Sequence, residues 1–203
     1  WQGNRRHGFG VQRWTDGACY KGQWKHDCAD GLGEFQHGDG DRFVGHWRQS
    51  VAHGMGCYYH KDLTTYQGQW YNDLQEGYGV EGWAEGTRFE GSFKGGQKEG
   101  YGVYHWPDGS TYEGTWEKNA ISGVGAYIGN DGRWYHGTWQ DSVIHGLGQY
   151  VWPNGRQYAG QYVYDRKDGF GTFTWPDKRK FDGFWSQGRQ HGMGRSTLKG
   201  GST

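Results

Sequence analysis

The sequence is poor in the residues on which an ordinary globular core depends. Leu, Ile and Val are scarce, the 203 residues include three prolines and two methionines, and the formal net charge is zero. The shortage of aliphatic residues excludes a conventional core, so apolar burial must come from aromatic rings laid against glycine backbone. The zero net charge argues against a protein held mainly by nucleic-acid phosphate.

The remaining absences bear on where the protein resides. The three cysteines, Cys19, Cys28 and Cys57, are an odd number at spacings that match no zinc or redox motif, which fits a reducing compartment. We see no signal peptide and no apolar run near the length of a membrane span. We therefore expect a cytoplasmic protein.

Glycine and aromatic residues are abundant instead, and they recur at a fixed interval. A Gly-x-Gly pair returns every 23 residues without insertion or deletion, and so does an aromatic residue followed two positions later by glycine. Such a period is typical of a repeat architecture. The first glycines of the pairs are Gly8, Gly31, Gly54, Gly77, Gly100, Gly123, Gly146, Gly169 and Gly192. We predict one continuous array of about nine repeats over 1–203, which starts in mid-repeat at residue 1.

Each unit reads as two alternating segments around a turn, which is the pattern of a β-hairpin. In the fifth repeat, 100–106 and 112–116 each place glycines and aromatic residues on one face. Facing residues of an antiparallel pair must point the same way, so the loop needs an odd length. The Pro-Asp-Gly loop (107–109) meets this parity as a type I turn with a left-handed glycine in a G1 bulge. Leu63 and Lys178 replace that glycine elsewhere, and we expect altered or more mobile turns there.

Six residues separate one hairpin from the next, as in EKNAIS (117–122), and their fourth position is commonly apolar. Cys28 occupies that fourth position, so we expect it to pack. Hairpins stacked edge to edge would advance the sheet by roughly 10 Å per repeat. A glycine facing an aromatic residue would let the ring lie flat across the neighbouring strand. The predicted fold class is all-β, an elongated, twisted, single-layer antiparallel sheet of stacked hairpins.

Charge is distributed unevenly along the chain. Residues 1–132 carry 12 Lys and Arg against 17 Asp and Glu, whereas 133–203 carry 10 against 5. An acidic front and a basic back could steer a partner or orient self-association. Scattered, solvated charge on strand faces is the alternative interpretation.

These features resemble the MORN repeat (membrane occupation and recognition nexus), whose consensus is close to YxGxWxxGxxxGxGxxxxxxG. Here the consensus falls on Tyr112, Gly114 and Trp116, then on Gly123 and Gly125, and on equivalent positions throughout nearly the whole chain. The chain is similar in style to repeat-only MORN scaffold proteins of protist (apicomplexan and kinetoplastid) cytoskeletons. The resemblance implies a cytoskeletal or cortical scaffold with a role in cell division, and we expect the C-terminal part of a longer array.

No catalytic motif is present in the sequence. No Ser or Cys stands beside residues that would activate it as a nucleophile. The recurring Asp16, Asp39, Asp108 and Asp131 are expected to form the turns themselves. Each Gly-x-Gly pair precedes a strand, whereas a phosphate loop needs a helix after it. We predict a protein that is not an enzyme and holds no cofactor.

Histidine precedes Gly-x-Gly in four repeats, and such a row could supply zinc ligands. Equivalent positions in adjacent repeats lie roughly 10 Å apart, too far to share an ion within one chain. A zinc site would therefore need a neighbouring linker residue or a second chain, and His145 and His191 are the candidates for a site between two chains. Solvated histidine is the alternative.

Membrane binding, which the family name suggests, requires a clustered basic patch. Arg156, Lys178, Arg179 and Lys180 form a modest cluster near two turns, balanced by acidic neighbours and without an amphipathic helix. A phosphoinositide- or anionic-membrane-binding module is therefore the alternative function.

We predict a scaffold that homodimerises and docks cytoskeletal or cortical proteins along its sheet, without nucleic acid. A single-layer sheet leaves a long aromatic surface poorly covered, which suits docking. The resemblance implies an extended helix as one kind of partner. We expect a twofold homodimer through the C-terminal repeats, and stacking within the chain is the alternative role of the rings there. The interface candidates are Trp152, Phe173, Trp175, Phe184 and Trp185.

Overall fold

The computed structural model describes residues 1–198 and consists of β-strands joined by short turns. It contains 17 strands within the described residues, which confirms the predicted all-β class. The chain divides into two compact units, Trp1–Gly100 and Tyr101–Thr203. In the part that the structure describes, no helix is long and apolar enough to span a membrane. The last five residues of the C-terminal RSTLKGGST segment, 199–203, lie outside the described residues.

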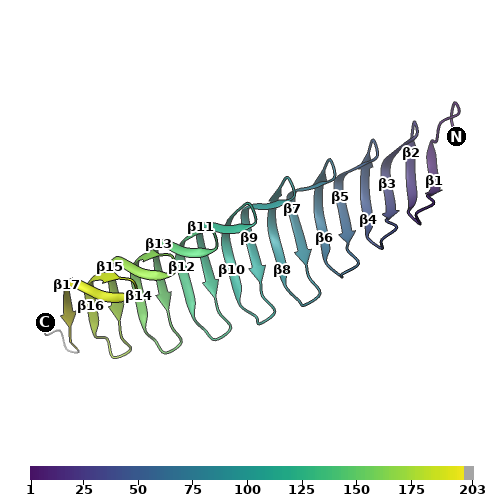
Figure 1. The fold of residues 1–203 in the computed structure, drawn as a ribbon. Coiled ribbons are helices and arrows are strands. Elements are labelled where there is room, and N and C mark those ends of the chain that lie inside the picture. Colours follow the sequence, from purple (N-terminus) through teal and green to yellow (C-terminus); the bar gives the residue numbers. More distant parts are fainter. Residues whose placement is uncertain (199–203) are drawn as a thin grey trace. The chain divides into compact units, whose positions relative to one another are not determined.

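Within each unit, consecutive strands pair antiparallel in one open layer (Figure 1). The first unit contains β1 (Gly8–Arg13), β2 (Cys19–Lys25), β3 (Cys28–Gln36), β4 (Arg42–Arg48), β5 (Val51–Tyr59), β6 (Thr65–Tyr71), β7 (Leu74–Gly82) and β8 (Arg88–Lys94). The boundary between the units falls within β9 (Gln97–His105). The second unit contains β10 (Thr111–Glu117), β11 (Ala120–Ile128), β12 (Trp134–Gln140), β13 (Val143–Val151), β14 (Gln157–Val163), β15 (Arg166–Thr174), β16 (Lys180–Ser186) and β17 (Arg189–Thr197).

Two kinds of turn alternate along the chain. In the Pro-Asp-Gly loop, Trp106 N–H donates to Ser110 O (3.0 Å), and Gly109, at φ +87°, donates to Trp106 O (3.0 Å). This confirms the predicted type I turn with a G1 bulge. The other turns have two residues at positive φ, such as Lys118 (+49°) and Asn119 (+69°), which is the type I′ conformation. The prediction of a six-residue linker is therefore wrong, because strand pairing continues up to this tight turn on both sides.

The aspartates predicted to form the turns do so by one repeated bond. Each carboxylate accepts the backbone N–H two residues ahead, at 2.8 to 3.2 Å. In this Asx arrangement the side chain accepts a hydrogen bond from the loop backbone and so mimics a backbone turn. The four residues are Asp16, Asp39, Asp108 and Asp131.

Leu63 and Lys178 adopt the same turn as the glycines, so the prediction of altered turns is wrong. Leu63 lies at φ +73° and donates its N–H to His60 O (3.0 Å). Lys178 lies at φ +69° and donates to Trp175 O (2.9 Å). The left-handed conformation costs a residue with a Cβ about 1–2 kcal/mol. The surrounding hairpin holds both residues in it nonetheless.

The core is a ladder of aromatic rings on one face of each sheet, which we call the ladder face. Tyr20 on β2 lies over the facing glycines Gly22 and Gly33, where a Cβ on Gly33 would meet its ring and a Cβ on Gly22 its hydroxyl. Its hydroxyl donates to Gln23 O (3.0 Å), which lies in the β-bulge before Trp24. Tyr20 is 1% exposed. The predicted packing of rings over glycine is therefore present.

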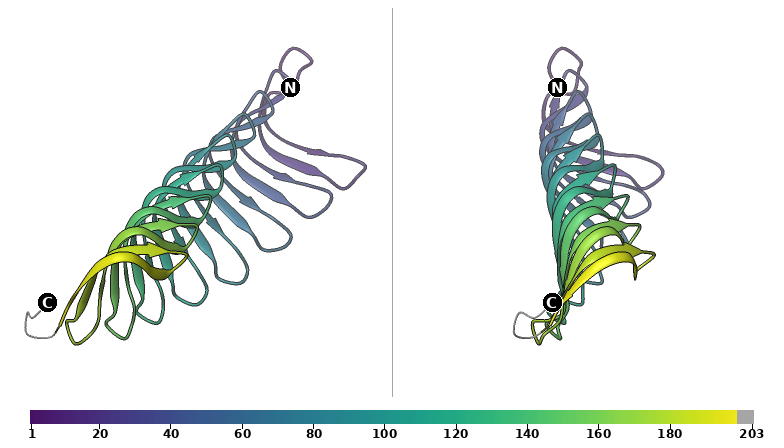
Figure 2. Two further views of the ribbon diagram at one scale, coloured as in Figure 1. Left: turned by 60° about the vertical axis from the view of Figure 1, so that its left-hand side comes forward. Right: turned by 90° about the vertical axis from the view of Figure 1, so that its left-hand side faces the viewer.

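Rings of successive repeats meet edge to face, an arrangement that aromatic pairs favour. The Tyr20 ring lies 5.0 Å from Trp24 and 5.5 Å from Trp47, centroid to centroid. The Trp47 indole N–H donates to Gly33 O (3.1 Å), which ties it to the preceding repeat. The long strands of each unit are arched (Figure 2), and the first glycine of each pair, such as Gly31 at φ +104°, supplies the local bend.

Candidate functional site

The ladder face of the first unit carries an open groove of about 470 Å³. Its lining is mostly aromatic, and Ala29 and Ala52 form the small residues between the rings. The charged lining residues are Arg6, Asp27 and Asp73. The groove is therefore an apolar surface with a polar margin. Its principal aromatic residues are Trp14, Tyr20, Phe35, Trp47, Tyr58 and Trp70.

One position of the repeat decides whether the ladder face is open or filled. Ala29 pairs across the sheet with Trp24, and Ala52 pairs with Trp47, so each alanine faces a closing aromatic residue. The sequence pattern singles out the preceding position, Cys28, but that residue is half-buried and Ala29 is the one that packs. We call the series containing Ala29 the variable position. Its members are Arg6, Ala29, Ala52, Gln75, Lys98, Ile121, Ile144, Lys167 and Gln190.

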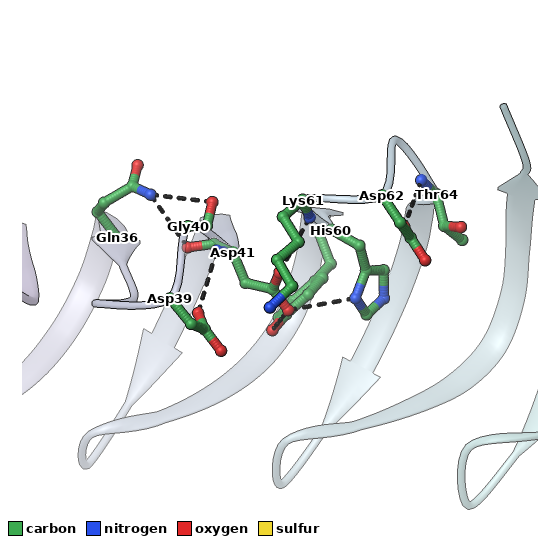
Figure 3. Close-up of polar contacts among 9 residues, drawn as sticks. Gln36, Asp39, Gly40, Asp41, His60, Lys61, Asp62 and Thr64 are labelled. Atoms are coloured by element: carbon green, nitrogen blue, oxygen red, sulfur yellow. Dashed lines mark hydrogen bonds and ion pairs between the residues drawn. The ribbon is translucent and has the colours of Figure 1, made fainter.

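Asp41 holds one wall of the groove in place. Its Oδ2 accepts the Tyr58 hydroxyl (2.9 Å) and lies 3.2 Å from His60 Nδ1, and its Oδ1 accepts Lys61 N–H (3.0 Å) (Figure 3). The Lys61 and Tyr58 hydrogen bonds lower the pKa of Asp41. Burial, followed by the Asp41 carboxylate, raises the pKa of Tyr58 to about 12. Tyr58 therefore presents a neutral ring to the groove.

The opposite face carries a row of exposed apolar side chains at the middle position of Gly-x-Gly. Each of them is more than half exposed. The second glycine of each pair, such as Gly33 beneath the Tyr20 ring, belongs to the ladder face, so the middle residue before it must point away from that face. Our sequence reasoning missed this row, although the position is apolar in all nine repeats. The residues are Phe9, Leu32, Met55, Tyr78, Tyr101, Val124, Leu147, Phe170 and Met193.

The five predicted interface residues do not form one surface. Phe173 and Trp185 are buried in the ladder of the second unit, and Trp152 and Trp175 pack against it half-buried. Phe184, which is 48% exposed, is the member of the set that faces solvent. Four of the five therefore contribute to stacking within the chain.

The two histidines proposed for zinc have different surroundings. His145 is half-buried with its ring 5.0 Å from Tyr164, and its Nδ1 has no hydrogen-bond partner among residues 1–198. His191 is exposed on β17. Over residues 1–198 no three His, Cys, Asp or Glu side chains come together as a metal site. The three cysteines are free and half-buried.

The predicted basic cluster lies on two neighbouring loops of the second unit. A Cβ built on Gly155 would be 3.7 Å from Pro176, which places the loops in contact. One of the four basic side chains is neutralised locally, since Arg179 Nε lies 2.7 Å from Asp177 Oδ2. All four are exposed: Arg156, Lys178, Arg179 and Lys180.

Two solved structures are similar to this chain at low identity. The TCP domain of SAS-4 (dCPAP) of Drosophila melanogaster, in complex with a proline-rich motif of dSTIL, is 11% identical, with a TM-score of 0.45 over 85% of this chain and 86% of that chain. The TCP10 domain of Danio rerio CPAP is 14% identical, with a TM-score of 0.36 over 86% of this chain and 83% of that chain. Neither likeness bears on function. Among curated proteins, none matches the chain.

The repeat itself matches a family model along the chain. The matched segments are 1–19, 20–42, 43–65, 66–88, 89–111, 112–132, 135–155, 158–178 and 181–203, and the model is described as the MORN repeat. These segments follow the period of the aromatic ladder. The chain therefore belongs to the MORN repeat family.

Proposed function

We propose that this protein is a non-catalytic scaffold that docks cytoskeletal or cortical partner proteins on the ladder face of its first unit. The observation that supports the proposal is the open aromatic groove over Ala29 and Ala52. Exposed apolar surface rimmed by polar groups is typical of interaction sites. A groove over two repeats, at roughly 10 Å each, would take an extended segment or one face of a helix.

The test fills the groove with a side chain that the repeat already tolerates. Ile121 and Ile144 occupy the variable position in the second unit, so Ala29→Ile with Ala52→Ile should fold. We expect proximity labelling in cells that express the protein to lose a defined set of partners with this double variant. Leu32→Ser on the opposite face should retain them. An unchanged partner set would place docking elsewhere.

Self-association is the second part of the proposal, as a twofold homodimer through the C-terminal repeats. The exposed rings of Phe170 and Phe184, with centroids 5.6 Å apart, support it as an apolar patch on the opposite face. Light scattering after size-exclusion chromatography should give a dimer that Phe184→Ser converts to a monomer. A wild-type monomer would refute the dimer. A dimer that a chelator splits would assign His145 and His191 to zinc between chains.

Anionic-membrane binding is the second candidate function. Arg156, Lys178 and Lys180 favour it, because they are exposed on or beside neighbouring loops and form no ion pair with any residue of 1–198. Each basic residue near an anionic surface contributes about 1 kcal/mol. Replacing the three by Gln should weaken binding to phosphoinositide liposomes about 100-fold at low salt. No binding by the wild type would exclude this function.

A further inference from the structure

We propose that Trp14, Tyr20, Phe35 and Trp47 form an aromatic cage that binds the ammonium group of a lysine on a partner protein. The inference deepens the proposed function, on which it rests, by naming the chemistry of the docked segment. The four rings surround Ala29 in the groove of the first unit. The same position six repeats later holds a cation.

In the eighth repeat the variable position is Lys167, and four rings enclose its ammonium group. Its Nζ lies 4.5 Å from the ring centroid of Trp185, 4.9 Å from Phe173, 5.6 Å from Tyr158 and 5.7 Å from Trp152. No carboxylate of residues 1–198 forms an ion pair with it. Burial lowers the pKa of Lys167. The negative faces of the rings are therefore what holds this ammonium group.

The site around Ala29 has the same four rings in nearly the same places. Three ring-to-ring distances are 5.7, 5.5 and 6.2 Å around Ala29, against 5.8, 5.3 and 5.9 Å around Lys167. Two of the ring pairs are closer to parallel around Lys167, at 38° against 67° and 64°. The corresponding rings, pair by pair, are Trp14 and Trp152, Tyr20 and Tyr158, Phe35 and Phe173, and Trp47 and Trp185.

The difference between the two sites is the side chain at the variable position. Ala29 lacks the stem and the ammonium group of Lys167, which leaves Trp14, Phe35 and Trp47 partly exposed around an open groove whose floor is the buried Tyr20. The chain fills this position with a cation twice more. Arg6 Cζ lies 4.0 Å from the Trp24 centroid, and Lys98 Nζ lies 4.9 Å from that of Trp83. Arg6 is also ion-paired with Asp27 and Lys98 with Glu81, so at these two positions the ladder face holds a cation together with a carboxylate.

The charges of the groove also favour a cation from outside. Among its charged lining residues, Arg6 is already paired with Asp27 (Nε to Oδ1, 3.4 Å), which leaves the Asp73 carboxylate in excess. The groove continues from the cage past Ala52 to Trp70, which gives room for the chain that carries the lysine. The occupant that fits is therefore a lysine within a protein segment.

Two capped tripeptides, Ala-Lys-Ala and its norleucine counterpart, test the charge directly, because norleucine keeps the stem of lysine without the ammonium group. NMR titration of the full chain would follow the Trp47 indole N–H, which is held by Gly33 O at 3.1 Å. We expect the lysine peptide to bind about tenfold more tightly, the ratio for one desolvated cation–π contact of ~1.4 kcal/mol.

Three variants place the peptide on the cage. Ala29→Lys supplies an internal ammonium group and should abolish binding, whereas Leu32→Lys, with the same added charge on the opposite face of β3, should leave it unchanged. Lys167→Ala should open a second cage, seen as new shifts at the Trp185 indole N–H. The loss in Ala29→Lys and the gain in Lys167→Ala would not follow from general charge attraction.

The contrary outcomes separate the cage from the scaffold. Equal binding of both peptides would overturn the cage and leave the groove as an apolar docking site, so the proposed function would stand. No binding of either peptide to the wild type would also overturn the cage, whatever Lys167→Ala shows. The proposed function is tested independently by whether the double variant Ala29→Ile with Ala52→Ile loses partners.

Discussion

Gly79→Ala should destabilise the protein far more than Gly82→Ala, although both glycines lie on β7 and neither adopts a positive φ. A Cβ on Gly79 would lie 2.5 Å from Cε2 and 2.6 Å from Cζ of Tyr66. A Cβ on Gly82 would meet Thr65 Oγ1 at 3.3 Å and nothing closer. The two substitutions therefore differ mainly in whether a buried ring must move.

The size of the effect follows from the position of Tyr66, which is 1% exposed. Its ring would have to shift by about 1 Å to restore van der Waals contact. That shift disturbs its packing against Trp70 (5.1 Å) and Phe93 (5.0 Å) and its bond to Gln69 O (3.0 Å). Overpacking costs about 1–3 kcal/mol and a lost hydrogen bond about 1 kcal/mol. We expect Gly79→Ala to lower the free energy of unfolding by about 2–4 kcal/mol.

Urea unfolding followed by tryptophan fluorescence and far-UV circular dichroism would measure both variants, provided the two curves coincide. Gly82→Ala should change the free energy of unfolding by less than about 1 kcal/mol, because alanine also reduces the entropy of the unfolded chain. In a Tyr66→Ala background, Gly79→Ala should cost less than about 0.5 kcal/mol. Equal effects at Gly79 and Gly82, or additivity with Tyr66→Ala, would refute the role of the ring.

Three further predictions concern the turns and the titrating groups. Leu63→Gly and Lys178→Gly should each raise the free energy of unfolding by about 0.5–1 kcal/mol in thermal melts, because they relieve left-handed strain of about 1–2 kcal/mol at some entropic cost. Burial raises the pKa of Tyr112 and Tyr158 to about 12, so the free energy of unfolding measured with urea should be flat between neutral pH and pH 10 and fall between pH 10 and 12, by about 3 kcal/mol per tyrosine; a flat alkaline profile would contradict this. The Lys61 and Tyr58 hydrogen bonds hold the pKa of Asp41 below its ordinary range, so its contribution to stability is present near neutral pH and lost in acid; Asp41→Asn should flatten the acid limb of the same profile.

Much of the fold could be predicted because its signals are local and repeated. Facing residues of the two alternating segments must point to the same side, which requires a loop with an odd number of residues. Gly109 marks the left-handed residue of that loop. The second kind of turn was missed because its residues, such as His26 and Asp27, lack the Asn-Gly or Asp-Gly signal of a type I′ turn. Leu63 was misread because a hairpin closed on both sides can impose a strained conformation that the residue would not choose.

The candidate site was harder to predict, because the same ring types occur in every repeat. Sequence alone does not distinguish Trp185, which is buried beside Lys167, from Trp47, which lines the groove beside Ala29. The two tryptophans can be told apart only from the strand register. That register pairs Ala29 with Trp24 and so places the variable position on the ladder face. The open groove therefore became visible only when the strand pairing was known.

The alanines at this position argue for function over stability. An isoleucine at Ala29 or Ala52, as at Ile121 and Ile144, would bury about three more carbon atoms, worth ~2 kcal/mol each time. Each repeat depends mainly on its neighbours, so such a change would not disturb the rest of the array. Two consecutive repeats nevertheless keep alanine and leave Trp14, Phe35 and Trp47 partly exposed along the groove. Packing gives no reason for that choice, whereas a surface that receives a partner requires it.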